Sequence, residues 1–226
     1  MVTAIRKSQK WGAGSFLLGL GGIGGCQELP RTYDSGPTSE SVMFSDNFDE
    51  NSFDRNWKTT GTGYKIVDGR LTVHNAHNHP LWLKQPLPDH FRIDFDAWAL
   101  EDSGDIKFEV AGDGKSFATK SRYIASGYVL IFGGWNNTLH LIARQDEHGP
   151  NKVSRKNPRV VPHRQYRMTV IRNGSKIRWL VDNQELLRFY DEKPLLGPSN
   201  RSFAFNGWES STQFDNLVIR ALPSPP

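Results

Sequence analysis

Two neighbouring segments of the sequence place carboxylates where they would meet across a sheet. Residues 91–98 and 105–111 both alternate apolar and polar side chains, which is typical of half-buried β-strands. If residues 101–104 form the loop of a hairpin, Asp96 lies directly opposite Glu109, with about 5 Å between the Cβ atoms. At that distance one carboxyl can keep a proton and act as a general acid while the other stays ionised, as glycoside hydrolysis requires.

Other arrangements would also relieve the repulsion between these carboxylates. The predicted face carries Asp94, Trp98 and Lys107 as well. A cation could bind among the carboxylates, or Lys107 and nearby arginines could pair with them on a solvated sheet face. The same polar side chains would suit a bound sugar, so the catalytic, cation-binding and ion-pair interpretations all stay open.

Tryptophan side chains are a second source of candidate chemistry, because an exposed indole stacks on the apolar face of a pyranose ring. Trp98 shares the polar face of the predicted hairpin, and Trp135 and Trp208 lie in turn-rich segments. We expect carbohydrate contacts from these three residues, with core packing as the alternative. For Trp57 and Trp179 we expect core packing.

The elements that must position these residues are short strands. From residue 44 onward, alternating segments are separated by Gly, Asp, Asn and Pro, and no amphipathic helix of three turns is found. About eight to twelve strands in one domain predict an all-β sandwich of two antiparallel sheets. The most specific predictions are hairpins of 128–133 with 138–144 and of 166–172 with 176–181, and a closing strand at 214–222.

The chain starts with the features of an export signal. Three basic residues precede an apolar stretch at 11–25, and Cys26 is the only cysteine. The segment Ile23-Gly24-Gly25-Cys26 resembles the bacterial lipobox, which implies cleavage before Cys26 and acylation of its thiol. A buried structural cysteine behind an ordinary signal peptide is the alternative.

The sequence predicts a leader at 1–25, a lipidated cysteine and flexible tether at 26–43, a domain at 44–222 and a tail at 223–226. The tether is rich in Ser, Thr, Pro, Gly and acidic residues. Because Gln rather than Asp follows the cysteine, we expect the outer membrane in a Gram-negative host and otherwise the outer face of the cell membrane. Without the leader, 25 Lys and Arg face 24 Asp and Glu, so no nucleic-acid partner is expected, and the lipid is the expected membrane contact.

Several turn and packing motifs together resemble the concanavalin A-like jelly roll. They are Phe48-Asp49 with Trp57, Val67-Asp68-Gly69-Arg70-Leu71, Gly112-Asp113-Gly114, Val181-Asp182-Asn183 and Phe214-Asp215-Asn216-Leu217. Within this fold the chain is similar to laminin G-like modules and to 3-keto-disaccharide hydrolase-like proteins. The resemblance implies two curved antiparallel sheets, with a glycan usually held on the concave face or its rim. The Glu-x-Asp-x-x-Glu run of the glucanases in this superfamily is absent, which counts against an endo-glucanase.

The same resemblance suggests a structural calcium ion, because jelly rolls of this type often pin their terminal strands with one. Asp46, Asp49 and Asp215 lie at suitable chain ends, although Asp215 could equally accept backbone hydrogen bonds in a turn. His79 belongs to a group of three histidines within six residues that has no evident fourth metal ligand. We expect His79 to hydrogen-bond a sugar from a loop at the rim.

A long connection at 145–165 carries five basic residues and three prolines, and long loops of this kind are often functional. This connection would contact an acidic glycan or a phosphate-bearing envelope polymer. The alternative is a solvent-exposed loop without a binding role. We therefore expect a lipid-anchored module that binds a polysaccharide or oligosaccharide at the cell envelope. The alternatives are a glycoside hydrolase or related sugar-cleaving enzyme that uses Asp96 and Glu109, and a structural or protein-interaction module.

Overall fold

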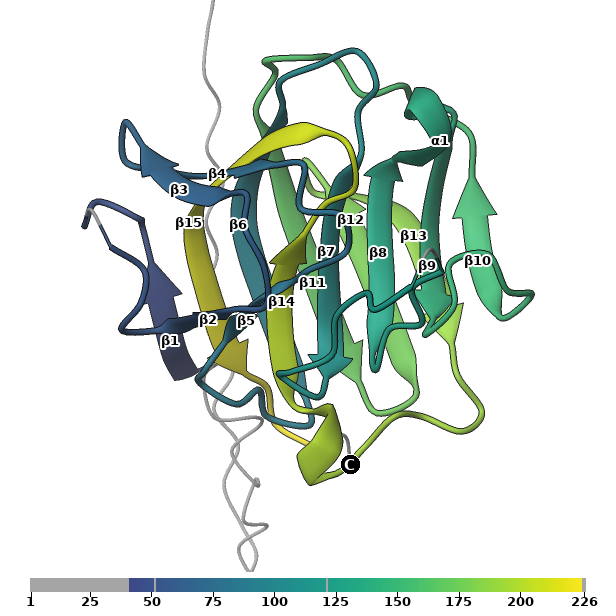
Figure 1. Ribbon diagram of the computed structural model, residues 1–226. Helices are drawn as coiled ribbons and strands as arrows, with labels where there is room; N and C mark the ends of the chain where they lie inside the picture. The colour runs from purple at the N-terminus through teal and green to yellow at the C-terminus, as the bar shows by residue number, and fades with distance from the viewer. Residues whose placement is uncertain (1–40, 51, 121, 225–226) are drawn as a thin grey trace, which may run out of the picture. The chain divides into compact units, whose positions relative to one another are not determined.

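The protein folds into two antiparallel sheets, shown in Figure 1. The structure is a computed structural model that describes residues 41–50, 52–120 and 122–224. The eight-stranded sheet contains, in spatial order, β13 (Gln184–Tyr190), β12 (Lys176–Val181), β11 (Tyr166–Asn173), β6 (Phe91–Ala99), β15 (Ser211–Ala221), β4 (Arg70–His74) and β3 (Tyr64–Val67), with β1 (Ser41–Asp46) also paired with β15. The all-β sandwich expected from the sequence is confirmed.

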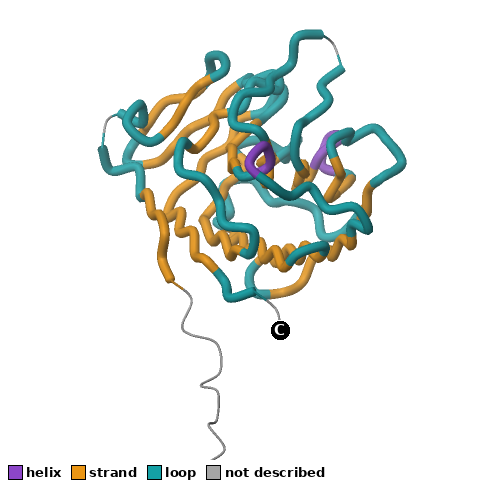
Figure 2. Tube along the Cα trace, turned by 90° about the horizontal axis from the view of Figure 1, so that it is seen from below, coloured by secondary structure: helices purple, strands orange, loops and turns teal. Residues whose placement is uncertain are grey.

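The second sheet has seven strands. Its spatial order is β10 (Lys152–Arg155), β9 (Leu139–Arg144), β8 (Tyr128–Gly133), β7 (Ile106–Gly112), β14 (Ser202–Asn206), β5 (Leu81–Leu83) and β2 (Trp57–Thr59). Figure 2 shows that the only helical segments among the described residues are two short turns, α1 (Gly134–Asn137) and a 3-10 turn at Pro198–Asn200.

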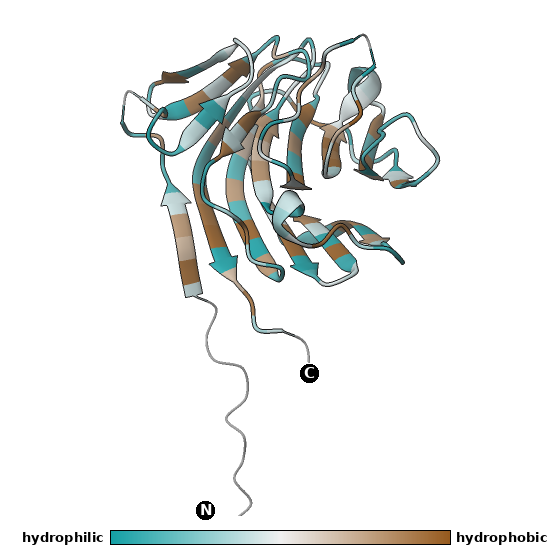
Figure 3. Ribbon diagram, turned by 60° about the horizontal axis from the view of Figure 1, so that its bottom comes forward, coloured by the Kyte–Doolittle hydropathy of each residue, from teal (hydrophilic) through white to brown (hydrophobic). Residues whose placement is uncertain are grey.

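Alternating side chains decide which face of each strand enters the core. Phe95 on β6 packs edge-to-face on Phe108 of β7 with ring centroids 5.0 Å apart, and Phe203 and Phe205 of β14 join the same cluster. All four rings are buried, and burial of each contributes about 1.5–3 kcal/mol to folding. Figure 3 shows the alternation of hydrophilic and hydrophobic residues along many of the strands. The polar half of the pattern is therefore left for the two outer faces of the sandwich.

Both hairpins predicted with specific turns are confirmed. Strand β8 pairs with β9 across α1, and β11 pairs with β12 across the Asn173-Gly174 turn. The closing strand begins at Ser211, three residues earlier than expected. Fifteen strands are present among the described residues, more than the eight to twelve expected, because strands as short as β2 and β5 leave little pattern in the sequence. Trp57 and Trp179 are 2% and 0% exposed, so their expected place in the core is confirmed.

The hairpin expected to join residues 91–98 to 105–111 is wrong. Strands β6 and β7 belong to different sheets, and the segment between them crosses from one sheet to the other. The amide of Asp105 donates to the carbonyl of Gly133 at 3.0 Å, which ties the end of this crossing to β8. The alternating pattern fixes which side chains face the core, but it is the same for a hairpin as for two strands in facing sheets.

The predicted leader, Cys26 and nearly all of the predicted tether lie outside the described residues. The tether was expected to reach residue 43, whereas residues 41–43 already belong to β1 and pair with the end of β15. Among the described residues, no helix has the length and apolar character needed to cross a membrane.

Candidate functional site

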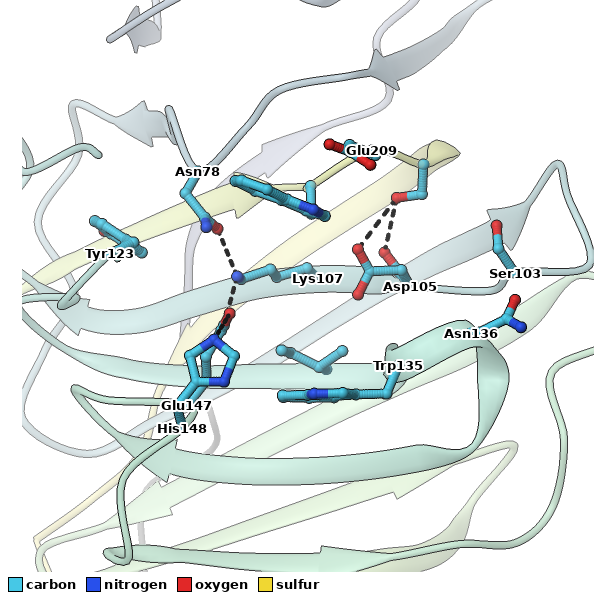
Figure 4. Close-up of a pocket in the computed structure, with 13 residues that line it drawn as sticks. Asn78, Ser103, Asp105, Lys107, Tyr123, Trp135, Asn136, Glu147, His148 and Glu209 are labelled. Atoms are coloured by element: carbon cyan, nitrogen blue, oxygen red, sulfur yellow. Dashed lines mark hydrogen bonds and ion pairs between the residues drawn. The ribbon is translucent and has the colours of Figure 1, made fainter. Parts of the chain in front are cut away.

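A cavity of about 490 Å³ opens on the outer face of the seven-stranded sheet, within the size range of small-molecule sites. Strands β7 and β8 supply its floor, and loops from distant parts of the chain supply its walls. Figure 4 shows most of the side chains pointing into it. The lining residues are Asn78, Ser103, Asp105, Lys107, Tyr123, Ile131, Trp135, Asn136, Glu147, His148, Trp208, Glu209 and Ser210.

Lys107 forms the polar centre of the floor. It points outward from β7, yet it is only 1% exposed because loops close over this face. Its ammonium donates to Asn78 Oδ1 and to Glu147 Oε2, both at 2.5 Å (Figure 4). Glu147 lies in the loop after β9 and Asn78 in the loop after β4, so this one side chain joins three segments.

Glu109 lies two residues further along β7 and is fully buried below the cavity. Its Oε2 accepts from the Tyr123 hydroxyl at 3.1 Å, and its Oε1 accepts from Asn206 Nδ2 at 2.7 Å. Burial raises the pKa of Glu109 to about 7, although Lys107 and the two hydrogen bonds oppose the shift. The carboxyl therefore anchors the wall residue Tyr123 without lining the cavity itself.

Asp105 lines the cavity at the start of β7. Burial raises the pKa of its carboxyl, Lys107 lowers it, and the negative charge of Glu147 raises it further, with a net increase. The Ser210 hydroxyl donates to Asp105 Oδ2 at 3.3 Å (Figure 4). Asp105 is thus a carboxyl that binds protons more readily than usual, and it faces a cavity large enough for a sugar ring.

Trp135 stands on a left-handed turn between β8 and β9. Its φ of 51° and that of Asn136 at 57° lie in a region that bulky residues seldom adopt. The buried Asn137 holds this turn, because its side chain donates to the carbonyls of Asp102 and Val160 and accepts from the Val160 amide. The indole itself is 42% exposed. An exposed aromatic ring on a fixed backbone is a preorganised platform for a ligand.

Trp208 comes from the loop between β14 and β15 and is 41% exposed. Its ring packs edge-on against His77 with centroids 5.1 Å apart, and His148 packs similarly on Trp135 at 5.5 Å. Both tryptophans expected to meet a sugar from turn segments therefore line one cavity, together with Lys107.

Three further predicted site residues, Asp94, Asp96 and Trp98, lie on β6 and face the opposite outer side, that of the eight-stranded sheet. Trp98 was the strongest exposed candidate, but it is only 6% exposed, because the guanidinium of Arg70 covers it at 4.1 Å from the ring centroid. Asp94 accepts hydrogen bonds from Arg92, Thr169 and Arg220, and Asp96 accepts from Arg167 at 3.1 Å and Asn216 at 2.9 Å. The expectation that Trp98 is an exposed platform is wrong.

The expected pair of Asp96 and Glu109 is not formed. Asp96 is registered with Arg167 on β11 and Asp215 on β15, whereas Glu109 is registered with Val129 on β8 and Ala204 on β14. The core of the sandwich separates the two carboxylates, so the catalytic pair predicted from a hairpin is wrong.

Each of the expected calcium ligands accepts at least one hydrogen bond within the protein. Asp46 accepts from the Phe48 amide and from Trp57 Nε1, Asp49 accepts from Asn47, and Asp215 accepts from the Asn216 amide. Across the described ranges, no three His, Cys, Asp or Glu side chains form a group that could hold an ion. The calcium site therefore stays a prediction.

His79 stacks on Phe117 with centroids 5.5 Å apart and is not among the cavity residues. Conversely, the sequence interpretation missed Asn78, Tyr123, Asp105 and Glu147. They come from separate loops, so only the topology brings them together. The one available signal was the long connection after β9, which does contain Glu147 and His148.

No protein-family model matches the chain, and no curated protein matches it either. Solved structures share its fold at low sequence identity. Carbohydrate binding module CBM66 from Bacillus subtilis has a TM-score of 0.57 and 12% identity, covering 74% of this chain and 96% of that one. A protein of unknown function with a galectin-like fold, also from Bacillus subtilis, has a TM-score of 0.56 and 15% identity over 84% and 100% of the two chains. An endo-β-1,3-glucanase from Pyrococcus furiosus has a TM-score of 0.54 and 11% identity over 82% and 96%. The chain therefore has a jelly-roll sandwich fold that also occurs in carbohydrate-binding modules and glucanases.

Proposed function

We propose that the domain binds a saccharide in the cavity on the outer face of the seven-stranded sheet. The observation that carries this proposal is the pair of exposed tryptophans, Trp135 and Trp208, which line one cavity with several hydrogen-bonding groups. Indole rings supply stacking surfaces for pyranose faces, and convergent carboxylate, amide and hydroxyl groups match sugar hydroxyls. The fold shared with a carbohydrate-binding module supports the same interpretation.

The local backbone gives further support. A tryptophan with positive φ costs about 1–2 kcal/mol relative to an ordinary conformation. The buried side chain of Asn137 stabilises this conformation through three hydrogen bonds. Such local strain is characteristic of functional positions, because packing alone gives no reason to hold an exposed ring there.

Binding is tested by titrating the full chain with a panel of neutral, amino and acidic polysaccharides and measuring retention in affinity electrophoresis. We expect Trp135→Ala to weaken retention by about tenfold or more, as truncation of an aromatic hot spot does. Trp98→Ala is the matched control, because that ring lies on the other sheet under Arg70. Retention that falls equally in both variants, or in neither, would contradict the proposal.

Sugar cleavage is a second candidate function, favoured by one observation. Asp105 lines the cavity with a raised pKa, and Glu147 and Glu209 line it as well. A protonated carboxyl near an ionised one is the arrangement of a glycosidase. Product release from a retained polysaccharide, abolished in Asp105→Asn, would support the enzyme. Retention without any product would favour the binding module.

We also propose that the chain is exported and anchored through a lipid on Cys26. The basic and apolar leader and the Ile23-Gly24-Gly25-Cys26 segment support this assignment. In a bacterial host, labelled palmitate should be incorporated into the wild-type protein and not into Cys26→Ser. In a Gram-negative host the lipidated protein should fractionate with the outer membrane. Equal labelling of both proteins would contradict the assignment.

A further inference from the structure

The charges around the cavity are unbalanced. Three carboxyl groups line it, those of Asp105, Glu147 and Glu209, against the ammonium of Lys107 and the imidazole of His148, whose Nε2 lies 3.5 Å from Glu147 Oε1. No arginine is among the lining residues, and Glu109 adds a further carboxyl directly beneath. The wall of the cavity is therefore acidic, although the chain as a whole has a formal net charge of +4.

The one ammonium is poorly accessible to an anion, because it is buried and two of its three N–H groups already have partners. Lys107 is 1% exposed and already donates to Asn78 and Glu147 at 2.5 Å. A sugar carboxylate or sulfate would meet the carboxyl groups of Asp105, Glu147 and Glu209, and the described lining offers it no unpaired lysine or arginine. The basic residues of the 145–165 connection, which suggested an acidic glycan, do not line the cavity.

Glu209 is placed to attract a cation. It is exposed next to Trp208, and it has no hydrogen bond or ion pair within the described part of the chain. Trp135 and Trp208 present two further surfaces that favour a positive charge, because the face of an indole attracts ammonium groups. A free carboxylate beside exposed indoles is a combination that recognises an amine.

We infer that the saccharide bound in this cavity carries a protonated amino group, as an amino sugar does. The inference rests on the proposed function and narrows it to one class of ligand. The aromatic rings would hold the sugar ring, and Glu209 would pair with its ammonium at the mouth of the cavity. Neutral sugars would bind more weakly, and uronic acids most weakly.

The test compares four ligands that share one ring and differ in charge. The methyl glycosides of glucose, glucosamine, N-acetylglucosamine and glucuronic acid are titrated into the full chain at low salt, following the tryptophan indole N–H signals by NMR. We expect glucosamine to bind about three- to tenfold tighter than glucose, from one exposed ion pair with a cation–π contribution. Half-molar salt should reduce this advantage, because screening weakens exposed charge pairs.

Glu209→Gln should remove the glucosamine advantage, measured as the ratio of glucosamine affinity to glucose affinity within the same variant. Glu50→Gln is the matched control, because it makes the same charge change at an exposed position that does not line the cavity. Equal affinity for glucose and glucosamine, or preference for glucuronic acid, would overturn the inference and leave the proposed function standing. Failure of every sugar to shift the indole signals would overturn both.

Discussion

The two outer faces of the sandwich use similar residues in different ways. The eight-stranded sheet carries Asp94, Asp96 and Trp98, yet each is covered or paired by an arginine. The seven-stranded sheet carries Lys107 and Glu109, and there the loops fold over the face and leave two tryptophans exposed around a cavity. The comparison teaches that the loops, and not the polar composition of a strand, decide where a site forms.

The largest effect should come from Lys107, whose charge is buried on the cavity side. Lys107→Met removes the partner of Glu147, and breaking a buried pair costs about 3–5 kcal/mol of unfolding free energy. Arg178→Met is the matched change on the other face, where both partners are partly exposed and the loss should be about 1 kcal/mol or less. Urea denaturation of both variants measures the difference in unfolding free energy. Equal losses would contradict the proposed difference between the two outer faces.

The next largest effect should be a pH dependence of the unfolding free energy that has opposite signs for buried carboxyl groups on the two outer faces. The pKa of Glu109 is raised to about 7 from 4.5, so folding favours its protonated form. This contribution is full below about pH 4.5 and is lost as the pH rises through about 7, on the order of 3 kcal/mol. The free energy of unfolding should therefore decline over this range in the wild type, and this component should vanish in Glu109→Gln.

Asp94 should show the reverse sign. Burial raises its pKa, but hydrogen bonds from Arg92 and Thr169 and the arginine charges lower it by more. Its contribution is present above its ordinary pKa of 3.8 and is lost as the pH falls through the lower folded-state value. Asp94→Asn should remove that acid-side loss while leaving the decline near neutral pH, as urea titrations at a series of pH values would show. If Asp94→Asn changes the decline near pH 7 instead, the two faces are coupled.

A smaller effect should follow from loosening the turn below Trp135. Asn137→Ala leaves the buried Val160 amide without its partner, which costs about 1–3 kcal/mol. Affinity for the sugar should fall by a few-fold, because the indole would lose its fixed position. Asn173→Ala, in the exposed hairpin turn of the other sheet, should change sugar affinity by less than the error of calorimetry. Unchanged affinity in Asn137→Ala would show that the ring needs no fixed backbone.

The smallest effect should be loss of a surface pair on the eight-stranded sheet. Glu185→Gln removes a carboxylate that accepts from Arg178 and Arg188, all partly exposed to solvent. We expect a change of about 0.5 kcal/mol or less in unfolding free energy, declining further with added salt. A loss above about 2 kcal/mol would mean that this face is as tightly organised as the cavity floor.

Much of the fold could be predicted from local patterns in the sequence. The turns at Asn173-Gly174 and at Gly134 to Asn137 join strands close in sequence, so residue types alone fix those hairpins. The crossing between β6 and β7 could not be predicted in this way, because alternation does not say which sheet a strand enters. That one error moved Asp96 to the wrong face and paired it with Glu109.

The site was predicted only in part, for the same physical reason. Trp135, Trp208 and Lys107 were expected from their chemistry, and the structure brings them to one cavity. Asp105 and Tyr123 reach it from different loops, and no local signal in the sequence indicates that these loops converge. Residues that depend on long-range topology therefore have to be read from the structure.

The left-handed turn at Trp135 has a consequence for how this chain responds to selection. A glycine at that position would adopt the same φ without the steric penalty of about 1–2 kcal/mol, which offsets the larger backbone entropy that glycine loses on folding, so Trp135→Gly should change the stability of the fold little. Random variants screened for heat resistance alone would therefore be free to lose the indole. Only selection for ligand binding would retain the indole. Sequencing a mutant library after each kind of selection would therefore show whether Trp135 is kept for ligand binding or for stability.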